Sequence, residues 1–144
     1  MQADLNTAKQ LLTGLGYTCV LAQEDRVRTS FHRGVRPLLE FLDSGEDLSG
    51  FSAADKVVGK ATAFLYCLLR VRAVHAQVLS KPARQVLADH GIPCTWDRLV
   101  DGIRNRTDTG PCPMEQATRD CATPEEALTA IRATLLHLQQ ASQP

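Results

Sequence analysis

The chain has 144 residues, of which 44% are hydrophobic and 22% are charged, close to the composition of an average soluble globular protein. This length can bury a hydrophobic core, and we expect one domain over residues 1–144 with its core between about 4 and 138. Sixteen basic residues balance sixteen acidic ones, so no net charge favours nucleic acid or an anionic membrane as a partner.

The beginning of the chain and its cysteines favour a cytoplasmic protein. An acidic residue, Asp4, comes early, and no cationic segment precedes an apolar run, so we expect no signal peptide. The most apolar stretch, 61–69, is too short to span a bilayer. The five cysteines include no C-x-x-C pair, which suits reduced thiols better than a disulfide framework. Nothing in the sequence predicts an oligomeric state.

The first third of the chain predicts a helix, a hairpin and a second, short helix. Leu5, Ala8, Leu12 and Leu15 form one apolar stripe, and Gly14 and Gly16 should end the first helix. The β-branched and aromatic residues of 17–22 and 26–31 flank a polar turn and predict a hairpin. Proline at position 37 then favours the start of a short helix over 38–42.

The remaining elements alternate between helices and strands. The longest helix is predicted from Ser52 to Leu69, with an apolar face that includes Val57 and Phe64. After it we expect a strand over 73–79, a helix over 82–90, a strand over 94–96, a helical turn over 97–103, a polar loop over 105–111, and two helices that start at about 113 and 124.

This order predicts an α/β fold with three layers, αβα, around a mixed sheet. Ligand sites in such open sheets lie at the carboxyl ends of the strands, next to helix N-termini. The segments that we expect to surround a site are therefore 49–60, 80–84 and 105–115.

The first candidate site surrounds Asp55. The spacing Ser52-x-x-Asp55 is that of a capping box, in which Asp55 would only stabilise the start of a helix. Its neighbours favour a further role, because Lys56 and Lys60 would form a like-charge pair one turn apart. Gly59 would cost about 1 kcal/mol inside a helix relative to alanine. Two unfavourable features at one helix start indicate an anionic ligand, with solvated surface lysines as the alternative.

The second candidate site is the loop before the predicted helix at Pro113. Arg106 and Thr109, with neighbouring polar residues, are the kind of groups that bind phosphate or carboxylate. Pro113 in the first helical position would make Cys112 the N-cap residue, where the helix dipole favours thiolate over thiol. Glu115 could return to the Cys112 amide or act as an acid or base. The alternative is a turn-forming linker with a small buried cysteine.

Three stretches resemble an uncharacterised prokaryotic family, a domain of unknown function placed in the cytidine-deaminase-like superfamily. These stretches are Tyr17-Thr18-Cys19-Val20-Leu21, residues 45–61, and residues 105–115 with their Cys112-Pro113-Met114-Glu115. The resemblance covers about 4–138 and implies a three-layer αβα fold, in agreement with the element order. It implies no established activity.

The chain departs from the true deaminases at both zinc-binding positions. Those enzymes place His/Cys-x-Glu at the helix after the hairpin and P-C-x-x-C at the helix after the third strand. Here we align 53–56 and 81–84 with these positions, and neither holds a zinc ligand. The histidines have no metal-binding spacing either. We therefore expect no zinc, no other metal and no cofactor.

The sequence thus leads to two hypotheses. The first is a ligand-binding domain or enzyme for a small anionic, nucleotide-like molecule, held by Asp55, Lys56, Lys60, Arg106 and Thr109, with Cys112 and Glu115 as candidate catalytic residues. The second is a non-catalytic scaffold that regulates a protein partner, in which side chains would close the crevice and apolar area would be exposed elsewhere. An open pocket lined by Asp55, Lys56 and Cys112 would favour the first.

Overall fold

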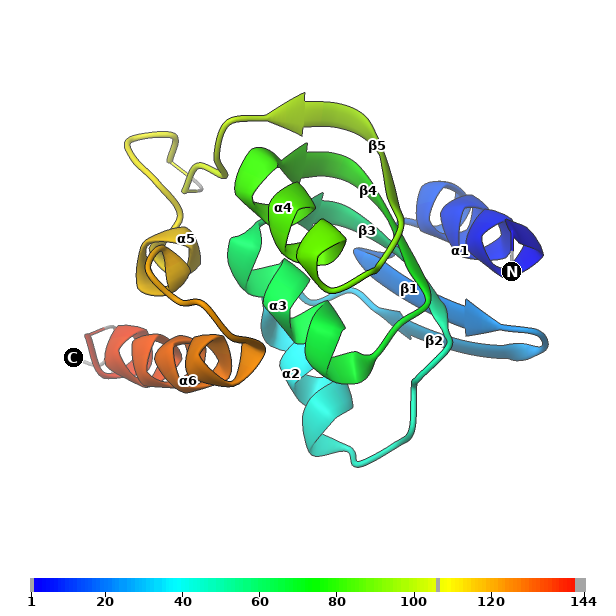
Figure 1. Cartoon of the computed structure of the whole chain (residues 1–144), viewed down its shortest axis with the longest axis horizontal. Coiled ribbons are helices and arrows are strands. Elements are labelled where there is room, and N and C mark those ends of the chain that lie inside the picture. Colours follow the sequence, from blue (N-terminus) through cyan, green and yellow to red (C-terminus); the bar gives the residue numbers. More distant parts are fainter. Residues whose placement is uncertain (1, 106, 142–144) are drawn as a thin grey trace.

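A computed structural model describes residues 2–105 and 107–141, and shows an α/β fold with helices on both faces of a five-stranded sheet (Figure 1). Its elements in chain order are α1 (Gln2–Leu15), β1 (Cys19–Gln23), β2 (Arg26–Ser30), α2 (Arg36–Asp43), β3 (Ser52–Val58), α3 (Lys60–Leu69), β4 (Ala73–Ser80), α4 (Lys81–Asp89), β5 (Cys94–Val100), α5 (Pro113–Thr118) and α6 (Pro124–Ala141).

The sheet is mixed, with the strand order β2-β1-β3-β4-β5. The predicted hairpin is confirmed as β1 and β2, and β1 also pairs antiparallel with β3. Strands β3, β4 and β5 run parallel, as the two expected helical crossovers require. The carboxyl ends of these three strands therefore lie at one edge of the sheet, where α3 and α4 begin.

Alternate residues of the central strands point into two hydrophobic cores. Val20 and Ala54 pack beneath α1 on one face, together with Ala8 and Leu12 of that helix. Leu21 and Ala53 face the opposite layer, where α3 and α4 cover the sheet and α6 packs on the outside of α3. These layers confirm the predicted αβα architecture.

Three predicted elements differ from the structure. Residues 52–58 form a central strand, not the first turns of a helix, and α3 begins only at Lys60. Residues 97–100 continue β5, where we expected a helical turn. The side chain of Leu15 is 59% exposed and does not extend the buried stripe of α1.

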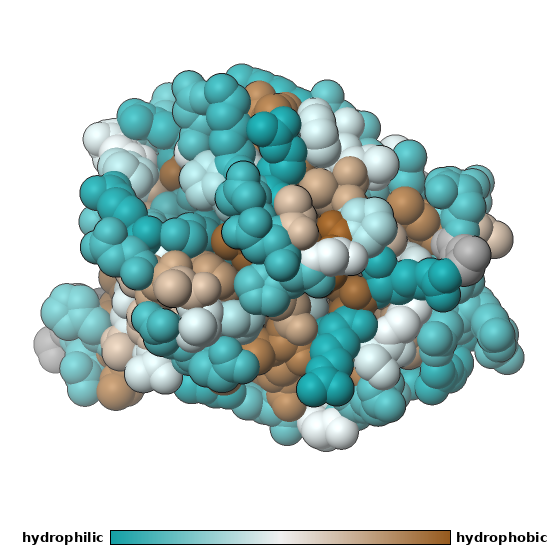
Figure 2. Space-filling model, in the orientation of Figure 1, coloured by the Kyte–Doolittle hydropathy of each residue, from teal (hydrophilic) through white to brown (hydrophobic). Residues whose placement is uncertain are grey.

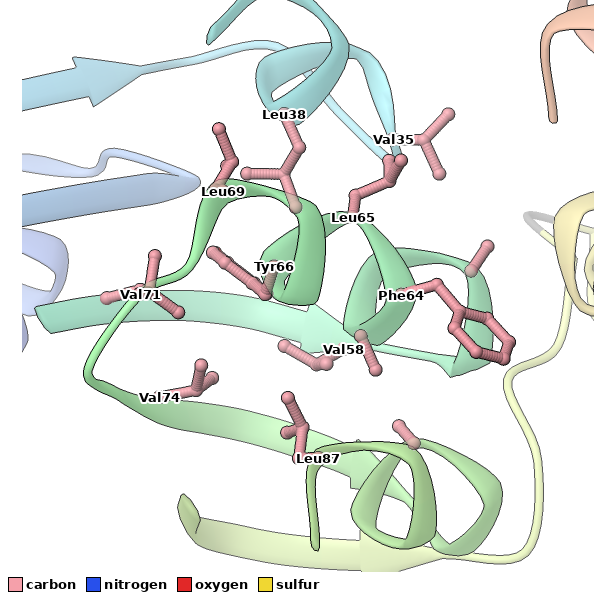
Figure 3. Packing of buried hydrophobic residues seen from close by; sticks show 14 of the residues in the cluster. Val35, Leu38, Val58, Phe64, Leu65, Tyr66, Leu69, Val71, Val74 and Leu87 are labelled. Atoms are coloured by element: carbon pink, nitrogen blue, oxygen red, sulfur yellow. The ribbon is translucent and has the colours of Figure 1, made fainter. Parts of the chain in front are cut away.

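The larger core lies between the sheet and the helices α2, α3 and α4, and it includes the aromatic side chains of Phe51, Phe64 and Tyr66. Figure 3 shows Tyr66 and Val58 among the apolar side chains between α3 and the sheet, with Leu87 of α4 beside them. The outer face seen in Figure 2 is mostly hydrophilic, with apolar side chains in small separate areas. Within residues 2–105 and 107–141, no helix is both long and apolar enough to cross a bilayer.

Candidate functional site

A cavity of about 470 Å³ opens at the carboxyl end of β3, where α3 begins. Its walls come from the segment between α1 and β1, the segment from the end of β2 to the start of α2, the end of β3, the first turn of α3, and the loop before α5 with the start of α5. The cavity is lined by Gly16, Thr18, Phe31, His32, Arg33, Gly34, Val35, Pro37, Asp55, Lys56, Val57, Gly59, Ala61, Thr62, Ile103, Cys112, Met114 and Glu115. Four of the seven predicted site residues are in this set, namely Asp55, Lys56, Cys112 and Glu115.

Asp55 is a buried carboxyl group in the cavity wall, and it does not cap a helix as the sequence predicted. Strand β3 places it between β1 and β4, and its side chain is on the α3 face. Only 8% of the residue is exposed. Tyr66 donates a hydrogen bond to its Oδ2 at 2.7 Å, and the Val57 amide donates to Oδ1 at 3.3 Å. Burial raises the pKa of Asp55 to about 7, because desolvation outweighs these hydrogen bonds.

Glu115 lies on α5, but its carboxylate caps α3. Its Oε1 accepts a hydrogen bond from the backbone amide of Lys60, the first residue of α3. The amides of Ala61 and Ile103 also stabilise the charged form, yet desolvation outweighs them, so the pKa of Glu115 is raised. The predicted return to the Cys112 amide is wrong, because that amide donates to the carbonyl of Ile103.

Gly59 provides the space for this contact. It is the N-cap residue of α3 and has an extended backbone, so it contributes no capping side chain of its own. A Cβ at this position would collide with the Glu115 carboxylate and lie 3.0 Å from a side-chain carbon of Ile103. The glycine that we took as one sign of an anionic ligand therefore makes room for the carboxylate of Glu115.

The two predicted lysines do not share a helix face. Lys56 is an exposed residue of β3 that lines the cavity. Lys60 begins α3, and its Nζ donates a hydrogen bond to the carbonyl of Arg119 at 2.7 Å. The two residues belong to different elements because β3 ends before Gly59, and only Lys56 reaches the cavity.

Of the predicted site residues before α5, one lines the cavity and another is held by hydrogen bonds within the loop. Cys112 is the N-cap residue of α5, as predicted, with Pro113 in the first turn, and it lines the cavity half-buried. Thr109 does not line the cavity, and its hydroxyl and amide both bond to the Asn105 side chain, at 3.0 and 2.9 Å. Arg106, the remaining predicted site residue, lies outside the described residues.

The segment 31–37, of which all residues but Arg36 line the cavity, carries no motif that predicted a site. Phe31 is 63% exposed and packs against Tyr17, with ring centroids 4.6 Å apart and the ring planes tilted by 34°. His32 and Arg33 follow it along the cavity wall, and His32 Nδ1 lies 2.7 Å from Oε1 of Glu40. Two consecutive basic residues directly after a hairpin were the signal available in the sequence.

The helix boundaries also change which residues stand at the deaminase zinc positions. The helix after the hairpin is α2, which begins at Arg36, and the helix after the third strand is α3, which begins at Lys60. The two positions therefore fall on 35–38, Val-Arg-Pro-Leu, and 59–62, Gly-Lys-Ala-Thr, and not on 53–56 and 81–84. These residues offer no histidine, cysteine or glutamate. The residues at both helix starts do not fit zinc. Outside positions 1, 106 and 142–144, no cluster of three metal-binding side chains is found.

The comparisons with known proteins give a family and a fold. No curated protein matches the chain. The crystal structure of a DUF1893 family protein from Thermotoga maritima is similar, with a TM-score of 0.85, 23% sequence identity, and coverage of 92% of this chain and 90% of that one. A diaminohydroxyphosphoribosylaminopyrimidine deaminase/5-amino-6-(5-phosphoribosylamino)uracil reductase from the same organism matches at a TM-score of 0.42 and 16% identity, over 67% of this chain and 34% of that one. The domain of unknown function DUF1893 matches residues 7–135, and the chain belongs to this family.

Proposed function

We propose that this protein binds a small anionic, nucleotide-like ligand in the cavity at the end of β3. The observation that carries the proposal is that residues from distant parts of the sequence, Asp55, Lys56 and Cys112, line one open cavity. The volume of about 470 Å³ falls in the range of small-molecule sites, which combine an apolar lining with a few polar groups.

The distribution of charge supports a ligand with two unlike ends. Lys56 and Arg33 are exposed cations on the cavity wall, where a phosphate or carboxylate would find partners. Asp55 is a buried acid, which suits a hydrogen-bonding group of the ligand and not its anion. The exposed ring of Phe31 offers a surface for a planar group.

The deaminase-like placement of the family is part of this proposal. The cavity lies where a helix follows the first strand beyond the hairpin, which is the region that the sequence resemblance associates with the deaminase active site. Because the residues there do not fit zinc, the proposal needs no metal. Glu115 is engaged with the amide of Lys60, so we assign it a capping role and propose ligand binding ahead of catalysis.

A thermal-shift panel tests the proposal with ribose 5-phosphate, AMP, CMP and citrate as probes. A ligand at a hundred times its dissociation constant should stabilise the fold by about 2.7 kcal/mol. Lys56→Ala and Arg33→Ala should each reduce the shift, because each removes a cation from the cavity wall. Arg106→Ala tests in the same way the contribution predicted from the sequence.

The matched control is Arg98→Ala, which removes an exposed cation from β5, away from the cavity lining. It should leave the ligand-induced shift unchanged. Equal stabilisation of all variants would place the binding site elsewhere. If no probe stabilises the protein, the scaffold hypothesis is favoured, with the exposed Leu136 and Leu138 of α6 as the apolar surface to examine.

A further inference from the structure

A chain of three buried polar groups leads from β1 to the cavity. Cys19, Tyr66 and Asp55 are 1%, 0% and 8% exposed, in a region otherwise filled by apolar side chains. Tyr66 Oη lies 3.3 Å from the sulfur of Cys19 and 2.7 Å from Oδ2 of Asp55. The carboxyl group faces the phenol across the gap between β3 and α3, and Figure 3 shows the tyrosine within that layer.

The number of hydrogens on these groups determines which one donates in each of the two hydrogen bonds. A tyrosine hydroxyl has one hydrogen, and Tyr66 donates it to Asp55. The thiol of Cys19 must then donate to the tyrosine oxygen, since that oxygen has no second hydrogen to give. Cys19 thus donates to Tyr66 and Tyr66 donates to Asp55, so that Oδ2 of Asp55 is the final acceptor of the two hydrogen bonds.

The other carboxyl oxygen keeps most of its hydrogen-bonding capacity. Oδ1 accepts the amide of Val57 at 3.3 Å, a long bond for a carboxylate. A carboxylate has about four acceptor positions, and a buried one is costly unless they are used. The backbone amide of Lys56 also stabilises the charged form of Asp55. Because Asp55 lines an open cavity, the acceptor positions that are left can receive a donor group of a ligand.

We propose that Asp55 is the specificity-determining residue of the cavity, that it accepts an N–H of the ligand at Oδ1, and that Tyr66 and Cys19 are the positioning residues that hold Oδ2. The ligand class is an amine- or amidine-bearing planar molecule. This inference rests on the proposed function and names the group that would occupy the buried end of the cavity.

The charges around Asp55 determine how pH affects such a ligand. Strand β1 presents the thiol of Cys19 and α3 presents the phenol of Tyr66. Lys56 adjoins Asp55 in β3, while His32 and Arg33 of the segment after the hairpin and Glu115 of α5 complete the charged lining. The pKa of Asp55 is about 7. At lower pH the carboxyl group carries a proton on Oδ1, because Oδ2 already accepts from Tyr66, and Oδ1 becomes a hydrogen-bond donor. As pH falls, the cavity should therefore change from preferring ligands with an N–H donor to preferring ligands with a carbonyl acceptor.

Two ring-matched fragments, benzamidine and acetophenone, test this change on the full chain. Protein-detected NMR of the Val57 amide follows each fragment between pH 5 and 8.5. At pH 8.5 benzamidine should bind about tenfold more tightly than acetophenone, as expected for a charge-assisted hydrogen bond. The ratio should fall as pH drops through the titration of Asp55, and Asp55→Asn should abolish this pH dependence.

Tyr66→Phe separates positioning from packing. Loss of the phenol hydrogen should move the midpoint of the benzamidine profile to higher pH, because Asp55 loses the hydrogen bond that stabilises its charge. Cys19→Ala leaves the bond between Tyr66 and Asp55 in place and should move the midpoint less. If Tyr66→Phe does not fold, the wild-type and Asp55→Asn profiles decide the question.

Equal binding of the two fragments, or no binding of either at millimolar concentration, contradicts the inference. If AMP or ribose 5-phosphate still stabilises the protein through Lys56, the proposed function stands and only the role of Asp55 is wrong. If benzamidine binds as expected and no phosphate does, the anionic part of the proposed function is wrong instead.

Discussion

The hydroxyl of Tyr66 donates a hydrogen bond to the carboxylate of Asp55 at 2.7 Å, between two elements whose other buried side chains are largely apolar. The phenol shares this environment, and burial raises its pKa well above the usual value. The bond compensates only part of the cost of burying a carboxylate, which is why the pKa of Asp55 rises to about 7.

The first prediction is that Asp55 makes the fold less stable as pH rises. Its pKa is about 7 when folded and near 3.8 when unfolded, so the folded state holds more protons between these values. The free energy of unfolding should therefore fall from pH 4 to 7 and level off above it, by up to about 4 kcal/mol. Urea denaturation of the wild type and of Asp55→Asn at several pH values measures this.

Asp55→Asn should remove this contribution and stabilise the protein above pH 7, while the Tyr66 hydroxyl still has an amide oxygen to bond. The difference between the two proteins isolates Asp55 from other titrating groups. A difference that does not vary between pH 4 and 8 would show that Asp55 titrates normally.

Gly59→Ala should destabilise the fold by about 1–2 kcal/mol, because the new Cβ would force the Glu115 carboxylate away from the Lys60 amide. Gly14→Ala is the matched control. Position 14 is helical, no atom lies within 4 Å of its added Cβ, and alanine there should stabilise α1 by roughly 0.5–1 kcal/mol. Thermal unfolding of both variants checks the pair, and similar effects in both would argue against a collision at Gly59.

Cys112 should be alkylated faster than Cys19 and Cys67. It is half-buried at the cavity wall, whereas Cys19 is 1% exposed with a pKa raised well above its usual value by burial. Burial also raises the pKa of Cys67 to about 11. Competitive labelling with iodoacetamide, followed by peptide mass spectrometry, gives the order. A rate for Cys112 no faster than for Cys94 or Cys121 would contradict the reactivity expected from its N-cap position.

His75 should respond in opposite directions to its two charged neighbours. Burial lowers its pKa, Lys9 lowers it further, and Asp97 raises it. Lys9→Ala should therefore raise the His75 pKa and Asp97→Asn should lower it, both measurable by imidazole NMR titration. Because the folded pKa is below the unfolded one, the stabilising contribution of neutral His75 is lost as pH falls through 6.5. Equal shifts in one direction would contradict this assignment.

Periodicity predicted most helices and the hairpin, but it could not place β3. Ala53 and Ala54 favour a helix by intrinsic propensity, yet one packs under α3 and the other under α1. A central strand with helices on both faces has no polar side to alternate with, so its pattern matches that of a buried helix. The signals against the helix were Val57 and Val58 followed by a glycine.

Only part of the site could be predicted from the sequence, because its residues are brought together by the topology of the fold and not by one local motif. Asp55 was selected as a helix cap, and it reaches the cavity as a strand residue. Segment 31–37 joins it through the antiparallel pairing of β1 with β3, a long-range contact that no local spacing encodes. The contact between Glu115 and Lys60 depends in the same way on how α5 packs against α3.

The position of Glu115 in the chain also affects the order in which the protein can fold during synthesis. The start of α3 leaves the ribosome 55 residues before the carboxylate that caps it. At ordinary translation rates of about 5–20 residues per second, that interval is roughly 3–11 s. During this time the first amides of α3 are exposed to water or to a chaperone, and the cavity has no wall on its α5 side. The nascent chain can therefore pair β1, β2 and β3 early, but the ligand site is completed only when α5 arrives.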